Sequence, residues 1–188
     1  MNRTEIRLSG FGGQGIILAG YILGKAAALY DHKHSTMTQN YGPESRGGSC
    51  SAQVVMADTP VSYPHLTQPQ VLVAMSQEAY SKYVGELKDG GLLIIDEDLV
   101  RPNGDPKRVR LYSIPTTRIA EEMGRKMIAN IVMLGCLAAL DSSVSADALR
   151  QAVRSSVPKG TEDLNIKAFD RGYAYGQGLL HSQVPASA

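Results

Sequence analysis

A strand, a tight glycine turn and a helix follow one another over residues 5–20, and this run constrains the fold more than any other stretch. Four glycines, Gly10, Gly12, Gly13 and Gly15, separate an alternating segment from an apolar, helix-forming one. In the motif G-x-G-x-x-G, the glycines permit a sharp turn, let backbone approach a phosphate and let helix and strand pack closely. The N–H groups at the start of the helix would then face a bound anion. The alternative is a turn that serves only strand–helix packing.

Dinucleotide binding is the best-known use of such a turn, and it requires more than glycines. An acidic residue about 20 positions on should meet the ribose at the end of the second strand. Asp31 has roughly that spacing, but it lies in the polar connection before the strand predicted at 35–40. That strand ends in Thr-Gln-Asn, without a carboxylate. NAD or a flavin is therefore less favoured than the glycines alone suggest, whereas a phosphate or a nucleotide-like group remains open.

The order of the predicted elements indicates an α/β fold. Strands are predicted at 4–9, 35–40, 49–56, 71–75, 91–96 and 108–114, and helices at 14–30, 77–87, 116–123, 126–140, 145–156 and 163–180. This alternation predicts a doubly wound, mainly parallel sheet with helices on both faces, a Rossmann-like three-layer sandwich, followed by a helical C-terminal region. The strand at 49–56 alternates apolar and polar residues and should be half-buried. We expect one domain over 1–181 and a disordered tail over 182–188.

Composition limits what the chain can bind. Its 188 residues carry a formal net charge of +1 with acids and bases interspersed, which predicts neither a nucleic-acid partner nor a membrane partner. Cys50 and Cys136 lie far apart in sequence, which argues against a disulfide framework, a zinc site or an iron–sulfur cluster on this chain. Both are expected to be small buried hydrophobes. No apolar leader follows Met1, and no run of about 18 apolar residues occurs, so we expect a cytoplasmic protein.

A second glycine-rich loop at 41–48 is the other candidate binding element. It should lie at the carboxyl end of the second strand and near the first turn, because ligands of open α/β sheets bind outside the strand ends. Arg46 could bind a phosphate or carboxylate through its guanidinium fork. Glu44 could act as an acid, as a base or as an ion-pair partner of Arg46. A surface turn with a solvated arginine is the alternative.

The sequence shows no self-contained catalytic apparatus. The motifs G-x-S-x-G, H-E-x-x-H and G-K-[ST] are absent, and the four histidines have no ligand spacing. The acidic run 96–98 predicts a helix start or a turn rather than a metal site. The charged residues of 118–126 predict a solvated helix face with local ion pairs, and Asn130 is expected to bond to backbone. We therefore predict no catalytic residue and no metal ligand on this chain.

The two loops together resemble the gamma subunit, or gamma domain, of 2-oxoacid:ferredoxin oxidoreductases. The resemblance covers nearly the whole chain and rests on four segments: Gly10-Phe11-Gly12-Gly13-Gln14-Gly15-Ile16, the run Thr38–Gly48 with the following strand, Asn130 with Met133-Leu134-Gly135, and Asn165 with Ala168-Phe169 and Gly172. It implies a subunit of an enzyme that converts a 2-oxoacid, coenzyme A and oxidised ferredoxin into an acyl-CoA, carbon dioxide and reduced ferredoxin. The form of 41–48 is most similar to chains of the 2-oxoglutarate type, which produce succinyl-CoA.

The resemblance also implies how the work is divided between subunits. Thiamine diphosphate and iron–sulfur clusters would sit on partners, namely thiamine-binding alpha/beta-type subunits and a ferredoxin-like subunit, with ferredoxin as electron acceptor. The isolated chain would be inactive, and it could self-associate through surface meant for partners. This domain would contribute a coenzyme A contact, as backbone donors and an arginine on glycine-rich loops suit that ligand. The predicted binding residues are Gly10, Gly12, Gly13, Gln14, Gly15, Gly42, Glu44, Ser45, Arg46, Gly47 and Gly48.

Two other functions remain open at this stage. The first is a free-standing Rossmann-type oxidoreductase that uses NAD or a flavin. The second is an assembly scaffold subunit that binds no ligand of its own. Both would use the same strand–turn–helix element, so the arrangement around the turn has to separate them.

Overall fold

The computed structural model describes residues 3–41, 48–104 and 108–182 of the chain. The strands are β1 (Arg3–Phe11), β2 (His34–Tyr41), β3 (Ser49–Ala57), β4 (Val71–Ala74), β5 (Leu92–Asp96) and β6 (Arg110–Ile114). The α-helices are α1 (Ile16–Lys25), α2 (Gln77–Tyr83), α3 (Thr116–Glu122), α4 (Ala129–Leu140), α5 (Ala146–Arg154) and α6 (Glu162–Ser182). Short helical turns are η1 (Ala26–Tyr30) after α1, η2 (Val84–Glu86) after α2 and η4 (Lys126–Ile128) before α4. The predicted strands and helices are present, with ends that differ by a few residues.

The described strands form a six-stranded sheet in the order β2-β3-β1-β4-β5-β6. β1, β4, β5 and β6 pair in parallel, whereas β3 runs antiparallel between β1 and β2. The prediction of a mainly parallel α/β sheet is confirmed, but β3 separates β2 from β1, which are neighbours in the dinucleotide-binding order 3-2-1-4-5-6. Phe11 lies opposite Ser49, and Tyr41 lies opposite Cys50. The last residues of β1 and β2 and the first residues of β3 therefore lie at the same end of the sheet's strands.

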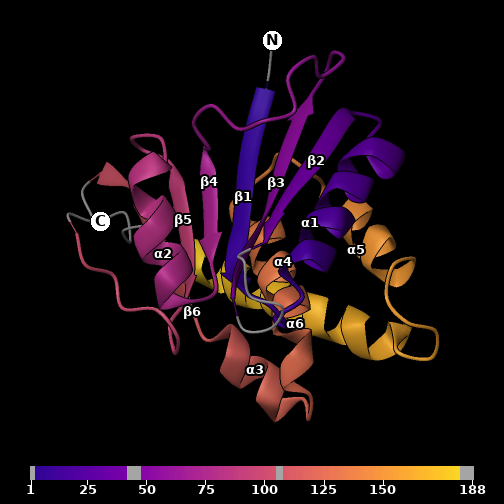
Figure 1. The fold of residues 1–188 in the computed structure, drawn as a ribbon. Helices are drawn as coiled ribbons and strands as arrows, with labels where there is room; N and C mark the ends of the chain where they lie inside the picture. The colour runs from indigo at the N-terminus through magenta and orange to yellow at the C-terminus, as the bar shows by residue number, and fades with distance from the viewer. Residues whose placement is uncertain (1–2, 42–47, 105–107, 183–188) are drawn as a thin grey trace, which may run out of the picture.

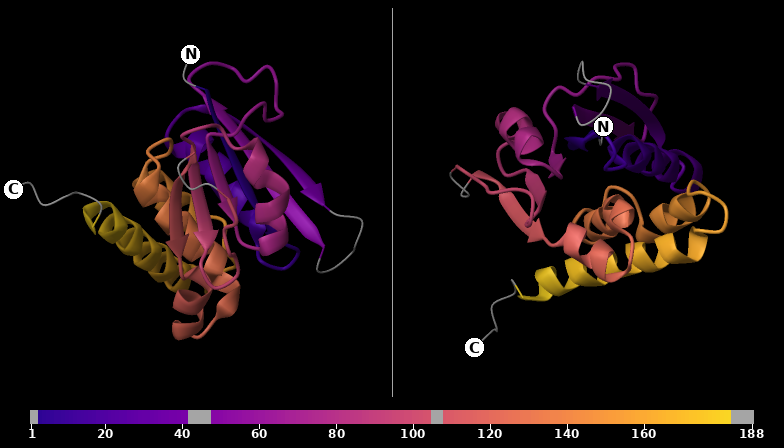
Figure 2. Two further views of the ribbon diagram at one scale, coloured as in Figure 1. Left: turned by 90° about the vertical axis from the view of Figure 1, so that its left-hand side faces the viewer. Right: turned by 60° about the horizontal axis from the view of Figure 1, so that its bottom comes forward.

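Helices cover both faces of the sheet, as predicted (Figure 1). On one face α2 packs over β1 and β4, with Tyr80 and Tyr83 in a small core beside β5. On the other face α1 lies over β3, and α4, α5 and α6 complete the main core. Figure 2 shows α6, in yellow, running along the outside of this helical layer. No helix among the described residues is long and apolar enough to cross a membrane.

β3 is buried on both faces, which corrects the prediction of a half-buried strand. Its predicted inward residues lie in the main core: Cys50, Ala52, Val54 and Met56. Ser51 and Val55, on the opposite face, are also fully buried. The Ser51 hydroxyl lies 3.4 Å from the hydroxyl of Tyr83 on α2. α2 thus packs near a face that the alternation pattern assigned to solvent.

α4 and α6 cross with their backbones in contact. A Cβ atom on Gly135 would lie 2.0 Å from the carbonyl oxygen of Phe169, and one on Gly172 would lie 2.0 Å from that of Val132. The Cys136 thiol donates a hydrogen bond to the Gly172 carbonyl (3.1 Å). Because backbone atoms cannot rotate away as a side chain can, these two glycines set the separation of the helices. The crossing fixes the first turns of α4 and α6, which form part of the site described next.

Candidate functional site

The glycine turn after β1 is closed by the side chain of Gln14. Its Oε1 accepts a hydrogen bond from the backbone N–H of Phe11 (2.7 Å), and its Nε2 donates to the carbonyl of Met75 (2.8 Å). Phe11 is the last residue of β1 and Met75 follows β4, so Gln14 joins the turn by hydrogen bonds to the ends of these two strands. Both polar groups of this side chain are used within the fold.

The glycines of the turn are required for different reasons, either close packing or a left-handed backbone conformation. A Cβ on Gly10 would lie 2.4 Å from Gln14 Oε1, so Gly10 allows close packing at the end of β1. Gly13 and Gly15 have φ angles of 99° and 72°, a left-handed conformation that glycine adopts without strain. Gly13 has open space at its Cβ position, whereas Gly15 lies against Asn130 of α4. Gly13 and Gly15 are the two members of the turn that line a cavity.

The first turn also contacts the segment that leads into β3. The backbone N–H of Gly12 donates a hydrogen bond to the carbonyl of Gly48 (2.9 Å). One end of the predicted second loop therefore lies beside the first turn. Five predicted binding residues fall outside the described residues, and their roles stay predictions: Gly42, Glu44, Ser45, Arg46 and Gly47.

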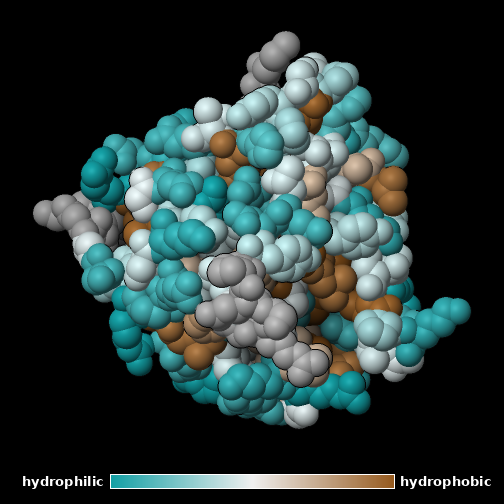
Figure 3. Space-filling view, viewed as in Figure 1, coloured by the Kyte–Doolittle hydropathy of each residue, from teal (hydrophilic) through white to brown (hydrophobic). Residues whose placement is uncertain are grey.

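A cavity of about 500 Å³ opens beside the glycine turn. Its walls come from the turn and α1, the α3–α4 connection, the first turn of α4, and the α5–α6 connection with the start of α6. Much of the lining is apolar: Leu18, Ile128, Ile131, Val157, Pro158 and Leu164. Hydrophobic surface shows between α1 and α6 in the space-filling view (Figure 3). Pockets for small organic ligands span about 300–1,000 Å³ and are mostly apolar, so this cavity has the size and character of one.

Arg125 and Lys126 give this apolar cavity a cationic side. Both residues line it and are exposed, in the connection that follows α3. The Lys126 ammonium lies 3.3 Å from the Glu121 carboxylate, an exposed pair that water and salt screen. The predicted solvated face with local ion pairs is confirmed for Lys126 and Glu121, but the sequence analysis missed that both basic residues border a cavity. The signal available was their position at the break between two predicted helices.

Two asparagines supply the buried polar groups of the cavity lining. Asn130 and Asn165 are 3% and 6% exposed. Asn130 Nδ2 donates to the Gly15 carbonyl (3.0 Å), which confirms the expected bond to backbone and joins α4 to the turn. Asn165 Nδ2 donates to the carbonyl (2.9 Å) and the hydroxyl (3.1 Å) of Thr161, just before α6. Asn165 and Thr161 are site residues that the loop motifs did not predict.

Asp31, the carboxylate considered for a ribose contact, has a structural role. Its two oxygens accept hydrogen bonds from the backbone N–H and the hydroxyl of Ser145, both at 2.6 Å. Ser145 caps α5 as predicted, since its Oγ accepts the N–H of Ala148 (3.2 Å). Asp31 thus joins the end of η1 to the start of α5. Together with the strand order, this disfavours a dinucleotide site at the glycine turn.

The acidic run 96–98, which begins at the last residue of β5, organises a helix start. Asp96 is fully buried and accepts hydrogen bonds from the hydroxyl of Thr116 and from the N–H (2.9 Å) and hydroxyl (2.7 Å) of Thr117. Hydrogen bonds to Asp98 and Glu97 raise the pKa of the Arg118 guanidinium. The prediction of a helix start or turn is confirmed. Across the described ranges, His, Cys, Asp and Glu side chains form no group of three that could hold a metal ion.

Cys50 and Cys136 are both free and buried, as predicted. Burial raises the pKa of both thiols above the ordinary value, most strongly for Cys136. The thiolate is the nucleophilic form of cysteine, and it is disfavoured at both positions near neutral pH. Neither thiol lines the cavity beside the glycine turn. The cysteines therefore serve packing rather than chemistry.

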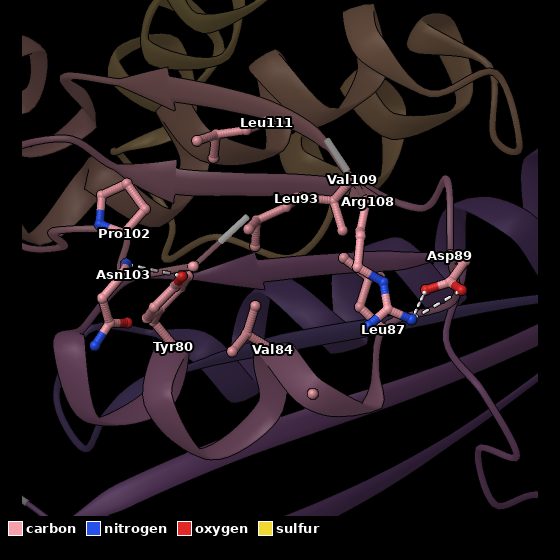
Figure 4. Close-up of a pocket in the computed structure, with 12 residues that line it drawn as sticks. Tyr80, Val84, Leu87, Asp89, Leu93, Pro102, Asn103, Arg108, Val109 and Leu111 are labelled. Carbon is pink, nitrogen blue, oxygen red and sulfur yellow. Dashed lines mark hydrogen bonds and ion pairs between the residues drawn. The ribbon is translucent and has the colours of Figure 1, made fainter. Parts of the chain in front are cut away.

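A smaller cavity of about 230 Å³ lies between α2 and the strands β5 and β6 (Figure 4). Its walls include the apolar side chains of Val84, Leu93 and Leu111. At one end Arg108 forms a two-pronged ion pair with Asp89, with distances of 2.8 and 3.0 Å. None of the predicted binding residues within the described ranges lines this cavity. The larger cavity beside the glycine turn is the better candidate site.

Comparisons with known proteins agree with this architecture. Residues 5–175 match the family described as pyruvate ferredoxin/flavodoxin oxidoreductase. The 2-oxoglutarate synthase subunit KorC of Methanocaldococcus jannaschii is 52% identical over 179 residues, which cover 94% of this chain and 96% of that relative.

Two solved structures have similar folds. The gamma subunit of the keto/oxoacid ferredoxin oxidoreductase from Geobacter sulfurreducens PCA superposes with a TM-score of 0.85 at 41% identity, over 95% of this chain and 98% of that one. The 2-oxoglutarate:ferredoxin oxidoreductase from Magnetococcus marinus, solved with 2-oxoglutarate, coenzyme A and succinyl-CoA bound, gives a TM-score of 0.85 at 26% identity. The match covers 95% of this chain but 32% of that longer one.

Proposed function

This chain belongs to the pyruvate ferredoxin/flavodoxin oxidoreductase family, and we propose that it supplies the coenzyme A-binding surface of a 2-oxoglutarate:ferredoxin oxidoreductase. It is the gamma subunit of a 2-oxoacid:ferredoxin oxidoreductase. Such a complex forms succinyl-CoA, carbon dioxide and reduced ferredoxin from 2-oxoglutarate, coenzyme A and oxidised ferredoxin, or runs in reverse. We expect the isolated chain to be inactive.

One observation carries the coenzyme A assignment: the glycine turn, a basic pair and an apolar cavity meet in one place. Coenzyme A has phosphate groups at one end and a long, mostly apolar arm that carries the reactive thiol. Arg125 and Lys126 suit the phosphates, because a cation at the mouth of a low-dielectric cavity attracts an anion. The backbone of Gly13 and Gly15 allows close approach of a ligand. The apolar walls suit the arm.

The division of labour within the complex follows from what this chain contains. An iron–sulfur cluster requires several cysteine ligands, and the two cysteines of this sequence are free and buried, one in β3 and one in α4. We assign thiamine diphosphate and the clusters to partner subunits, of the thiamine-binding and ferredoxin-like types. Thiamine diphosphate would supply the decarboxylation chemistry on the partner, and the arm of coenzyme A held by this chain would have to reach it. This chain binds and orients coenzyme A for that step.

The assignment of 2-oxoglutarate as the oxoacid rests on the relatives. The 52%-identical protein of M. jannaschii is a 2-oxoglutarate synthase subunit, and the M. marinus structure is that of a 2-oxoglutarate:ferredoxin oxidoreductase. A cavity that binds coenzyme A does not itself select the oxoacid. Substrate choice therefore lies mainly in the partner subunits.

Omitting this chain should abolish coenzyme A binding by the complex. We would produce the partner subunits with and without it, and measure coenzyme A binding by equilibrium dialysis and 2-oxoglutarate-dependent ferredoxin reduction. The complete complex should show both, and the complex without this chain should show neither while keeping its bound thiamine diphosphate. Full coenzyme A binding without this chain would contradict the proposal.

A further inference from the structure

The outer edge of β2 carries backbone groups that the fold leaves unpaired. β2 is the last strand at one side of the sheet, and β3 pairs with one of its edges only (Figure 1). In an antiparallel pair, alternate residues direct their N–H and C=O groups away from the partner strand. Across residues 3–41, 48–104 and 108–182, no hydrogen bond reaches these outward groups of β2. Such an edge is a template for one more strand.

β2 also lacks the features by which proteins protect a strand edge. Charged side chains, proline, a bulge or a very short strand discourage pairing. β2 is eight residues long, contains no Lys, Arg, Asp, Glu or Pro, and pairs with β3 one to one without a bulge. β6, at the other side of the sheet, has five residues and begins with the charged Arg110. The β2 edge is therefore the one suited to pairing, and a second neutral strand would meet no charge repulsion there.

A groove of about 280 Å³ runs beside this edge, between β2 and the helical segment of α1 and η1. Tyr21 and Leu29 line it and are 53% and 60% exposed. Ser35 and Met37 of β2 line it as well. The Ser35 hydroxyl oxygen is buried and has no hydrogen-bond partner among the described residues. A buried hydroxyl without a partner is costly, so a strand that joins this edge should bring apolar surface and a polar group for Ser35.

A second copy of β2 brings both when it pairs in the antiparallel direction. A twofold axis perpendicular to the sheet keeps the α1 side of both copies on one face, so residues of that side oppose each other. Ser35, Met37 and Gln39 lie on that side, because they pair with core-facing residues of β3. In the register centred on Met37, Met37 meets its own counterpart and Ser35 opposes Gln39 of the second copy. Opposed Cβ atoms lie about 4.5–5.5 Å apart, within reach of a glutamine amide.

We propose that two copies of this chain associate through their β2 edges and join their sheets into one. The exposed Tyr21 and Leu29 of both copies then lie on the same face of the joined sheet, and each Ser35 hydroxyl receives the Gln39 amide of the other copy. The inference goes beyond the proposed function. No residue of β2 lines the cavity beside the glycine turn, so coenzyme A binding does not depend on this association.

The first test measures the mass of the purified full chain by analytical ultracentrifugation over a range of concentrations. A species of twice the mass of one chain should form. Thr36→Lys places a charge on the edge and should raise the dissociation constant at least tenfold. Leu180→Lys is the matched control, because Leu180 is an exposed apolar residue of α6 far along the chain from β2. That control should associate like the wild type.

A double-mutant cycle tests the register. Gln39 is exposed, so Gln39→Ala should leave the melting temperature of the chain unchanged. It should raise the dissociation constant about tenfold, because the twofold axis makes every change act twice. In a Ser35→Ala background the same change should have no further effect, since the group that Gln39 contacts is gone. Additive effects of the two changes would exclude a contact between Ser35 and Gln39 and contradict the proposed pairing.

Hydrogen exchange identifies the surface. The backbone amides at 34–41 should exchange more slowly in concentrated than in dilute wild-type chain, whereas those at 110–114, in β6, should not change. A monomer at every concentration would contradict the inference, and so would association that Thr36→Lys leaves intact. Protection of 34–41 that appears only when partner subunits are added would show that a partner covers the edge, and the inference would again be wrong.

Discussion

Gly135→Ala is expected to lower the free energy of unfolding by about 3 kcal/mol, at the upper end of what overpacking costs. Its new Cβ would lie 2.0 Å from the carbonyl oxygen of Phe169, so α4 and α6 would have to move apart. For a chain of this size, the melting temperature should fall by about 6–12 °C. Because the crossing positions the first turns of both helices, the walls of the cavity should shift with it. Thermal and urea unfolding of the purified chain measure the change.

Gly178→Ala, on α6, the other helix of the crossing, is the matched control. A Cβ there meets nothing within 4 Å, and alanine favours a helix interior over glycine by up to about 1 kcal/mol. Gly178→Ala should therefore leave stability unchanged or raise it slightly. Equal destabilisation by both changes would mean that contact between the backbones at Gly135 does not decide the effect. Our account of the α4–α6 crossing would then be wrong.

The sequence was sufficient to predict the class of fold, because the local patterns of strands and helices agree with that class along the whole described chain. The apolar runs at 71–75 and 91–96 are buried parallel strands, and the 163–180 pattern is the long α6. It was not sufficient for the strand order, since no local pattern tells that β3 inserts between β2 and β1. The burial of Ser51 also escaped prediction, because it depends on α2, which is distant in sequence.

Only part of the candidate site could be predicted, because local patterns reveal a turn but not contacts between segments that are distant in sequence. Glycines reveal a turn from sequence alone, and Gly13 and Gly15 do line the cavity. Gln14 was predicted as a binding residue, but its side chain closes the turn by hydrogen bonds to β1 and to the residue after β4. Arg125 and Asn165 come from segments more than 100 positions further along, and only the packing of the helical layer brings them to the turn.

Reversing both charges at the cavity, in Arg125→Glu/Lys126→Glu, should weaken coenzyme A binding by the assembled complex about 100-fold or more. Hydrogen bonds to a charged group contribute about 1.5–3 kcal/mol each, and about 1.4 kcal/mol is tenfold in affinity. Two lost contacts therefore already account for that factor, and repulsion between carboxylates and phosphates adds to it. The Michaelis constant for coenzyme A should rise accordingly, while that for 2-oxoglutarate should change little.

Lys88→Glu/Arg110→Glu is the control for that charge reversal. It changes net charge equally, but both residues lie outside the cavity lining, near the starts of β5 and β6. Coenzyme A affinity should stay near the wild-type value there. Salt should also weaken binding to the wild-type complex, because it screens the attraction between Arg125, Lys126 and the phosphates, but should not weaken binding to the cavity variant, whose carboxylates repel the phosphates. Equal effects of the two double variants would show that only overall charge matters.

Hydrogen exchange in the assembled complex, with and without coenzyme A, tests most directly whether this chain binds that ligand. Coenzyme A should slow exchange of the backbone amides at 12–16 and at 125–131, which border the cavity beside the glycine turn. The amides at 84–89, beside the smaller cavity, should be unaffected. Protection confined to the partner subunits, with none on this chain, would contradict our account and favour a scaffold subunit that binds no ligand.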